Sequence, residues 1–255
     1  MEDANGVATP MADVSLAPHE DINYSADPEL RKWYQSVVGS LMYLMLSTRP
    51  DIAYAVSQLS RFSANPTEKH KVAVKHILRY LKQTIDYGLV FDSNNKDKGL
   101  IGYTDANWAR DYDRRSTGGF VFMLFGAIVT WSSKRQATIA LSSCEAEYIA
   151  ETEAAKEGIW LRRLLQHFNY SGPITVTIKG DNKGALALAK NPEFHARTKH
   201  IDIRYHFVRQ KVEEGLIELE WTGTAANIAD GMTKPLGRAV FDKFRGEIGL
   251  RVISD

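Results

Sequence analysis

The chain has 255 residues, 44% of them hydrophobic and 25% charged, which is the composition of a globular protein with one or two domains. Its 32 basic residues nearly balance its 31 acidic ones, so the net charge indicates no partner. Cys144 is the only cysteine, which excludes a disulfide framework and a cysteine-based zinc site. Without a signal-peptide pattern or an apolar run of membrane-spanning length, we expect an intracellular protein, cytoplasmic or nuclear, with no membrane partner.

The first part of the chain divides into an irregular leader and a helical segment. Residues 1–27 contain no lysine or arginine, and we expect a leader that packs, if at all, against another segment. Residues 28–94 show helical patterns. The three stretches are 27–47, 50–62 and 67–84. Pro28 and Pro50 stand where the first positions of the first two helices are expected, and apolar residues recur at helical spacing in the third stretch. We therefore predict a small all-α segment of three helices.

A row of basic residues runs along one side of the third predicted helix. It consists of Lys71, Lys75, Arg79 and Lys82. One interpretation is a solvated helix face, which is what such charge runs usually are. The other is a surface that follows nucleic-acid phosphates. The sequence leaves both open.

A polar, turn-rich stretch at 91–99 precedes a region with strand patterns. We predict an α/β domain over residues 95–238 and a C-terminal tail over 239–255. Because the later strands join through helices, the five-stranded sheet should be mixed and flanked by helices. The predicted strands lie within 100–107, 118–133 (two strands with a turn near Gly126), 172–182 and 216–223, and the predicted helices over 143–168, 183–191, 201–215 and from about Asp230.

Four acids occupy corresponding places in this succession. Asp105 and Asp181 end predicted strands, Glu147 lies in the first turn of the long helix, and Asp230 follows the last strand. Ligand sites in open α/β sheets gather where strand ends meet helix termini. Each acid alone also has an ordinary explanation, such as an Asx-turn or a helix cap. Together they would repel one another unless cations such as Mg²⁺ neutralised them. The pattern predicts a metal-dependent nuclease.

Two glutamates compete for one place in that cluster. Glu145 and Glu147 are two residues apart, about 200° around a helix, so they cannot face the same side. Ser142 or Ser143 is expected to cap the helix, and an acid in the first turn suits the helix dipole. Spacing alone does not decide which glutamate faces the other acids.

Long strings of this sequence resemble copia-type LTR retrotransposon Pol polyproteins. "YTDANWARDYDRRSTGGF" to "LSSCEAEYIAETEAAKEGIWLRRLL" and "NIADGMTKPL" resemble their ribonuclease H domain. Upstream, "YQSVVGSLMYLMLSTRPDIAYAVSQLSRF" and "HILRYLKQTIDYGLVF" resemble the thumb and connection of their reverse transcriptase. The resemblance covers nearly the whole chain.

The resemblance implies a ribonuclease H-like fold and hydrolysis of the RNA strand of RNA–DNA hybrids. It also implies two Mg²⁺ ions, with Mn²⁺ as an alternative, and the catalytic and metal-binding set Asp105, Glu147, Asp181 and Asp230. Glu147 is preferred to Glu145 because "EYIA" matches the family's Glu-hydrophobic-hydrophobic-Ala run.

Two departures from the family stand out. Many ribonucleases H have a histidine in the loop before the last aspartate, where this chain has "TGTAAN", so another group would have to assist product release. No Tyr-x-Asp-Asp motif occurs, so polymerase activity is not expected, and a separate polymerase segment is a possible partner.

The hybrid should bind through basic and polar residues around the same site. For Arg197, Lys199 and His200, helix capping and local ion pairing are an equally good interpretation. Trp108, Trp131 and Trp160 are expected in the core rather than as stacking platforms. The candidate contacts are Asn107, Arg114, Arg115, Ser116, Lys134, Arg135, Asn182, Arg197, Lys199 and His200.

Two other functions are open at this point. The first is a catalytically silent, nucleic-acid-binding relic that has kept the fold and lost the chemistry. The second is an integrase or another transposase of the same fold, which the order of the acids disfavours because its glutamate comes last. The oligomeric state is not predicted.

Overall fold

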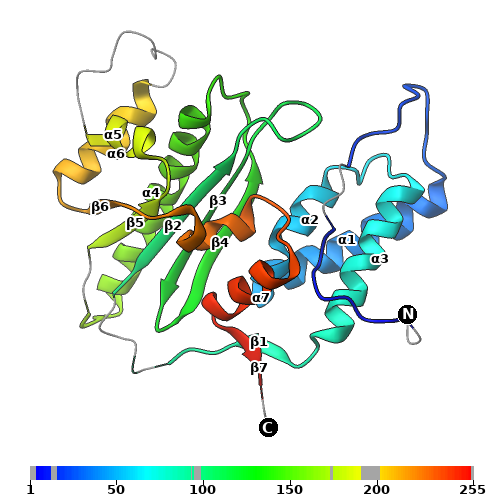
Figure 1. The fold of residues 1–255 in the computed structure, drawn as a ribbon, viewed down its shortest axis with the longest axis horizontal. Coiled ribbons are helices and arrows are strands. Elements are labelled where there is room, and N and C mark those ends of the chain that lie inside the picture. Colours follow the sequence, from blue (N-terminus) through cyan, green and yellow to red (C-terminus); the bar gives the residue numbers. More distant parts are fainter. Residues whose placement is uncertain are drawn as a thin grey trace. The chain divides into compact units, whose positions relative to one another are not determined.

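The computed structural model of the chain describes residues 4–12, 16–92, 94, 99–172, 175–190 and 202–253, which pack as two compact units (Figure 1). The helical unit comprises Met1–Val90 and Lys234–Asp255, and the sheet unit comprises Phe91–Thr233. The domain limits inferred from the sequence remain a prediction, but in the structure the C-terminal segment belongs to the helical unit. No helix in the described ranges is long and apolar enough to cross a membrane.

Three helices form the centre of the helical unit, which confirms the sequence prediction. They are α1 (Pro28–Ser47), α2 (Ala53–Ser60) after the 3₁₀ turn η1 (Pro50–Ile52), and α3 (Glu68–Gln83). Asp27 caps α1, because its carboxylate accepts a hydrogen bond from the Leu30 amide. Buried side chains such as Tyr34 and Ile77 fill the space between the helices.

The C-terminal segment completes the helical unit with one helix and one strand. Strand β1 (Tyr87–Leu89) pairs antiparallel with β7 (Leu250–Val252), and α7 (Arg238–Glu247) buries Phe241 and Phe244. The segment predicted as all-α therefore includes one short strand. No local pattern reveals β1, because its only paired strand lies near the other end of the chain.

The leader packs along α3, as expected of a segment without a core of its own. The Arg79 Nε donates to the carbonyl of Asn5 at 2.6 Å, and the Lys82 Nζ donates to the carbonyl of Ala4 at 3.0 Å. The His76 Nε2 lies 2.9 Å from the Thr9 carbonyl oxygen. The side chains of α3 thus hold the leader through its backbone.

These contacts change the interpretation of the basic row on α3. Arg79 and Lys82 donate to leader carbonyls, a contact that neither interpretation included, while Lys82 is still exposed to solvent. Lys71 pairs with Glu68 at 3.1 Å, and Lys75 is exposed. Arg79 and Lys82 thus have a structural role that a composition pattern cannot show, since their acceptors come from a distant part of the chain.

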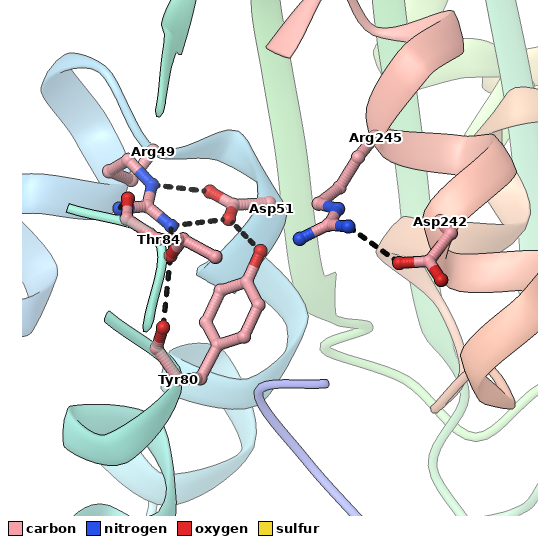
Figure 2. Close-up of polar contacts among 6 residues, drawn as sticks. All are labelled: Arg49, Asp51, Tyr80, Thr84, Asp242 and Arg245. Atoms are coloured by element: carbon pink, nitrogen blue, oxygen red, sulfur yellow. Dashed lines mark hydrogen bonds and ion pairs between the residues drawn. The ribbon is translucent and has the colours of Figure 1, made fainter. Parts of the chain in front are cut away.

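A buried polar network ties α3 to the start of α2 (Figure 2). The guanidinium of Arg49 donates to both carboxylate oxygens of Asp51 at 3.0 and 2.8 Å, and the Tyr80 hydroxyl donates to Asp51 at 2.5 Å. Arg49 also donates to the Thr84 hydroxyl at 2.6 Å and to its carbonyl at 3.1 Å. All four residues are buried. Burial, and the charge of Asp51, raise the pKa of Tyr80 far above its ordinary range.

The sheet unit contains a mixed five-stranded sheet in the order β4-β3-β2-β5-β6 (Figure 1). The first three strands form an antiparallel meander, whereas β5 runs parallel to β2 and β6 runs parallel to β5. This topology confirms the predicted α/β fold class. The strands are β2 (Ile101–Asn107), β3 (Thr117–Leu124), β4 (Ala127–Arg135), β5 (Val176–Gly180) and β6 (Ile217–Trp221).

Helical elements lie on both faces of this sheet. A Cβ on Gly118 would lie 3.3 Å from Ala150, whereas a Cβ on the next residue, Gly119, would lie 2.5 Å from Met232. Successive residues of a strand face opposite sides, so α4 covers one face of β3 and η5 covers the other. The helical elements of the unit are α4 (Ser143–His167), α5 (Lys183–Lys190), α6 (Asp202–Glu213), η4 (Thr224–Ala226) and η5 (Ile228–Met232).

The turn predicted near Gly126 is confirmed as a two-residue hairpin. Phe125 has φ 54° and Gly126 has φ 79°. Positive φ at both central positions matches the twist of the flanking strands, β3 and β4.

Two sequence predictions about this unit are wrong. Asp230 does not open the last helix, because it lies inside η5, and α7 begins only at Arg238. Pro235 stands between them and interrupts the helix by lacking an amide hydrogen. Trp108 and Trp160 are not core residues, since they are 52% and 54% exposed. Trp131 is partly buried.

The reason for the exposed tryptophans differs between them. Trp160 lies between Ile159 and Leu161 on α4, and these two neighbours occupy the buried positions. The Trp108 Nε1 donates to the Ala140 carbonyl at 3.0 Å, which fixes the indole over the loop that precedes α4.

Candidate active site

Three acids from three elements converge at one edge of the sheet. Asp105 lies on β2, Asp181 directly follows β5, and Glu147 lies in the second turn of α4. Because β2 and β5 are parallel neighbours, their carboxyl ends meet at the same edge. Each acid offers one carboxylate oxygen, and these oxygens lie within 4.8 Å of one another. The predicted convergence is confirmed for these three residues, whereas their role as metal ligands remains a prediction.

Asp230 is held beside this group through its backbone. Asn227 donates to the Thr104 carbonyl at 2.9 Å, and Asn107 donates to the Thr233 carbonyl at 2.6 Å, so η5 is fixed against β2 from both ends. The Thr233 hydroxyl contacts a carboxylate oxygen of Asp105 and the Asp230 carbonyl. Among the described residues, the group of converging oxygens comprises the other three acids, and Asp230 flanks it.

The cluster is buried and strongly electronegative. Asp105 and Glu147 are only 5% and 9% exposed, and Asp181 is partly buried. Burial, followed by the charges of Asp105 and Asp181, raises the pKa of Glu147 to about 9. Burial is thus the larger cause of the raised pKa of Glu147, and repulsion by the neighbouring acids adds to it. Three converging carboxylate oxygens form the donor set that Mg²⁺ or Mn²⁺ prefers, so the residues fit a divalent cation.

The metal-free protein should lose stability as the pH rises. The folded pKa of Glu147, about 9, exceeds its ordinary value of 4.5, so the folded state binds this proton more tightly. That stabilisation is complete below the unfolded pKa and is lost as the pH rises through the folded one. In EDTA, between about pH 4.5 and 9, the free energy of unfolding of the wild type should fall with rising pH by more than that of Glu147→Gln. The difference should be at least about 1.4 kcal/mol, the equivalent of one pKa unit. Urea unfolding across this pH range measures both slopes, and equal slopes would contradict the prediction.

The start of α4 explains why Glu145 faces away from the cluster. The Ser142 hydroxyl accepts a hydrogen bond from the Glu145 amide at 3.1 Å, and the Glu145 carboxylate accepts one from the Leu141 amide at 2.8 Å. These reciprocal bonds are a capping arrangement that satisfies amides at the helix start. Ser142, one of the two predicted candidates, is the cap, Glu145 supports it, and Glu147 is the glutamate that faces the other acids.

The polar candidates for nucleic-acid contact already have structural partners. Besides its bond to Thr233, Asn107 accepts from the Thr117 amide at 2.7 Å. Ser116 is fully buried and accepts from the Ala109 amide at 3.2 Å. Asn182 accepts from the amides that open α5. These side chains shape the loops at the site, and a contact with substrate remains a prediction for each.

The basic candidates fall into three groups. Arg114 and Lys134 are exposed. Arg135 and Arg115 pair with Asp113 at 2.7 and 3.7 Å. The remaining candidates, Arg197, Lys199 and His200, lie outside the described residues.

The strand register places most of the described candidates near the acids. In β2 and β3, Asp105 pairs with Gly119, and Asn107 pairs with Thr117, which in turn pairs with Arg135 on β4. The basic residues of this edge therefore lie within one or two rows of Asp105.

Several residues at the site were missed by the sequence analysis. The Thr224 hydroxyl donates to a carboxylate oxygen of Asp181 at 2.8 Å, and the Trp221 Nε1 donates to the Asp181 carbonyl at 3.2 Å. Thr233 contacts Asp105 in a similar way. Threonine and tryptophan carry no charge or spacing signal. The pairing of β5 with β6 brings Trp221 and Thr224 to Asp181, and the packing of η5 against β2 brings Thr233 to Asp105.

No family model matches this chain, but individual proteins do. It is 46% identical over 218 residues to the Retrovirus-related Pol polyprotein from transposon TNT 1-94 of Nicotiana tabacum, covering 85% of this chain and 16% of that polyprotein. It is 39% identical over 249 residues to the polyprotein from transposon RE2 of Arabidopsis thaliana, covering 97% and 17%. It is also 52% identical over 129 residues to Secreted RxLR effector protein 161 of Plasmopara viticola, covering 50% of this chain and 90% of that protein. The chain thus spans about a sixth of the polyproteins that it matches.

Solved structures of ribonucleases H and reverse transcriptases are similar at low identity. LC11-RNase H1 is 17% identical, with a TM-score of 0.42 over 57% of this chain and 96% of that one. The foamy viral protease-reverse transcriptase in complex with an RNA/DNA hybrid is 14% identical, with a TM-score of 0.48 over 78% and 27%. By the identities to the transposon polyproteins, the chain belongs to the copia-type retrotransposon Pol polyproteins.

Proposed function

We propose that the sheet unit is a metal-dependent endonuclease that hydrolyses the RNA strand of RNA–DNA hybrids. The convergence of Asp105, Glu147 and Asp181 carries this proposal, because three buried or partly buried carboxylates within 4.8 Å repel one another unless protons or bound cations neutralise them. The high identity to Pol polyproteins supports the same function.

The three acids would hold divalent cations, Mg²⁺ or Mn²⁺, with Asp230 as the fourth ligand implied by the family motif. When two such ions are bound, they supply an activated water and stabilise charge on the leaving oxygen of the phosphodiester. Two residues of the chain affect how such a cation would bind. Glu147 has a raised pKa and must give up its proton to become a ligand, and the Thr233 hydroxyl orients one carboxylate oxygen of Asp105.

The surface near the acids fits a nucleic acid. Arg135 pairs with Thr117, which pairs with Asn107, so it lies two rows from Asp105 on the same face of the sheet, and Arg114 is exposed. Positive charges beside the cluster would bind the phosphates that flank the cleaved bond. Binding of the hybrid, and assembly with a separate polymerase segment, are part of this proposal. Polymerase activity is not proposed, because the chain has no Tyr-x-Asp-Asp motif.

A silent nucleic-acid-binding protein is the second candidate. The observation that favours it is the loop "TGTAAN", where a histidine that assists turnover is expected. In this case the hybrid would bind without being cut.

One assay separates the two candidates. The full chain is incubated with a hybrid whose RNA strand is labelled, in Mg²⁺, in Mn²⁺ and in EDTA, with double-stranded DNA and RNA as controls. We expect cleavage of the hybrid only, dependent on the metal, with 3′-hydroxyl and 5′-phosphate ends. Binding without cleavage in either metal would support the silent protein. Undiminished cleavage in EDTA, or equal cleavage of double-stranded RNA, would contradict the proposal.

A further inference from the structure

An exposed tryptophan is fixed directly beside the acid cluster. Trp221 is the last residue of β6 and is 54% exposed. Its Nε1 donates to the carbonyl of Asp181, so the indole cannot rotate freely. The ammonium of Lys183, the first residue of α5, lies 4.8 Å from the ring centroid, within the range of a cation–π contact.

Exposure alone would not distinguish this tryptophan, since single exposed apolar side chains are ordinary. Its position does. Asp181, to which it is bonded, is one of the three converging acids, and Thr224 holds the carboxylate of the same residue. The ring and the ammonium therefore belong to the rim of the acid cluster.

The chemistry of this rim is complementary to a nucleic-acid backbone. A rigid aromatic face loses little entropy when it packs against a sugar or a base, and one positive charge beside it suits a phosphate. The bases of a hybrid are stacked inside the duplex, so the surface that reaches such a rim is sugar and phosphate. The acid cluster repels a negatively charged ligand, and a cation next to it, such as Lys183, offsets part of this repulsion.

We propose that Trp221 and Lys183 form a substrate-contact platform, in which the indole packs against a sugar and the ammonium binds a phosphate next to the scissile bond. This platform rests on the proposed function for the identity of its ligand, an RNA–DNA hybrid. Its contribution is to affinity and to the position of the strand, and it needs no metal.

The test measures binding in EDTA, where the hybrid is not consumed. Fluorescence anisotropy of a labelled hybrid is followed with the full chain over a series of salt concentrations. Trp221→Ala should weaken binding about tenfold, the scale of one aromatic contact to a nucleotide. Trp221→Phe keeps an aromatic face and should recover most of the affinity. Lys183→Met keeps the apolar stem and should reduce the salt dependence by about one phosphate contact.

Trp160→Ala is the matched control. Trp160 is also 54% exposed but lies thirteen positions after Glu147 on α4, about 20 Å along the helix, so its loss should leave affinity unchanged. Equal affinity of Trp221→Ala and the wild type would overturn the platform, as would equal losses in Trp221→Ala and Trp160→Ala. If Trp221→Ala fails to fold, Trp221→Phe and Lys183→Met decide. A loss of affinity of about tenfold in Trp221→Phe, the effect expected for loss of the whole ring, would then overturn the platform. An unchanged salt dependence in Lys183→Met would overturn it as well.

The two proposals fail separately. Cleavage of the hybrid with no effect of Trp221 on affinity would refute the platform and leave the nuclease function intact. Binding that depends on Trp221 and Lys183 in a protein that cuts nothing would refute the nuclease function and support the platform.

Discussion

Replacing Glu147 by glutamine should reduce cleavage of the hybrid at least about 10²-fold, an activation free energy of about 3 kcal/mol. Glu147 is buried, and its carboxylate lies with those of Asp105 and Asp181. Glutamine preserves the shape but cannot provide the negative charge that holds a cation. Cleavage rates in Mg²⁺ with saturating hybrid measure the loss.

The fold should tolerate this change unusually well for a buried position. Since the pKa of Glu147 is about 9, its carboxyl is neutral near pH 7 in the metal-free protein, and a neutral amide resembles that state. Hybrid binding in EDTA should therefore survive. A variant that loses cleavage, binding and folding together would show a structural role for Glu147 instead.

Glu145→Gln is the matched control on the same helix. The Glu145 carboxylate accepts a bond from the Leu141 amide, and a glutamine oxygen can still accept it. Cleavage should change little, and the free energy of unfolding should change by at most about 1 kcal/mol, the scale of a charge at a helix terminus. If instead Glu145→Gln abolishes cleavage and Glu147→Gln does not, the wrong glutamate has been assigned to the site.

Removing the carboxylate of Asp51 should destabilise the helical unit by about 3–5 kcal/mol. Asp51→Ala leaves the guanidinium of Arg49 buried without its main counter-charge and the Tyr80 hydroxyl without its acceptor (Figure 2). Leaving one partner of a buried ion pair uncompensated costs far more than the pair contributes. Hydrogen exchange of the α3 amides reports this unit directly, and exchange should accelerate strongly in the variant.

Asp242→Ala is the control, because it removes the exposed carboxylate of an ion pair. Asp242 pairs with Arg245 at 2.5 Å, but its side chain is 43% exposed, so its loss should cost no more than about 1 kcal/mol. Asp51→Asn should fall between the two, because it keeps hydrogen-bonding atoms and loses the charge. Equal exchange rates in Asp51→Ala and Asp242→Ala would mean that water compensates Arg49, and that the network is not a stabilising element.

Sequence reasoning was most successful where structure is determined locally. The hairpin at Gly126, a serine cap at the start of α4, the strand that carries Asp105 and the strand that Asp181 follows are all consistent with residue periodicity and with turn and cap chemistry. These features involve residues that are near one another in the chain. The resemblance to Pol polyproteins added the choice of Glu147, which spacing alone left open.

The tertiary structure decided what depends on distant partners. Arg79 belongs to a basic row for which the sequence left two interpretations open, and in the structure it binds the leader. The strand pairing of β1 depends on β7 near the other end of the chain. In the same way, Thr224 reaches Asp181 only because β6 pairs with β5. By itself the sequence determined the elements and the acids at their ends, since periodicity and capping act within a few residues. Which hydroxyls, cations and aromatic rings surround those acids was decided by packing, because such contacts join segments whose separation in the chain leaves no local pattern.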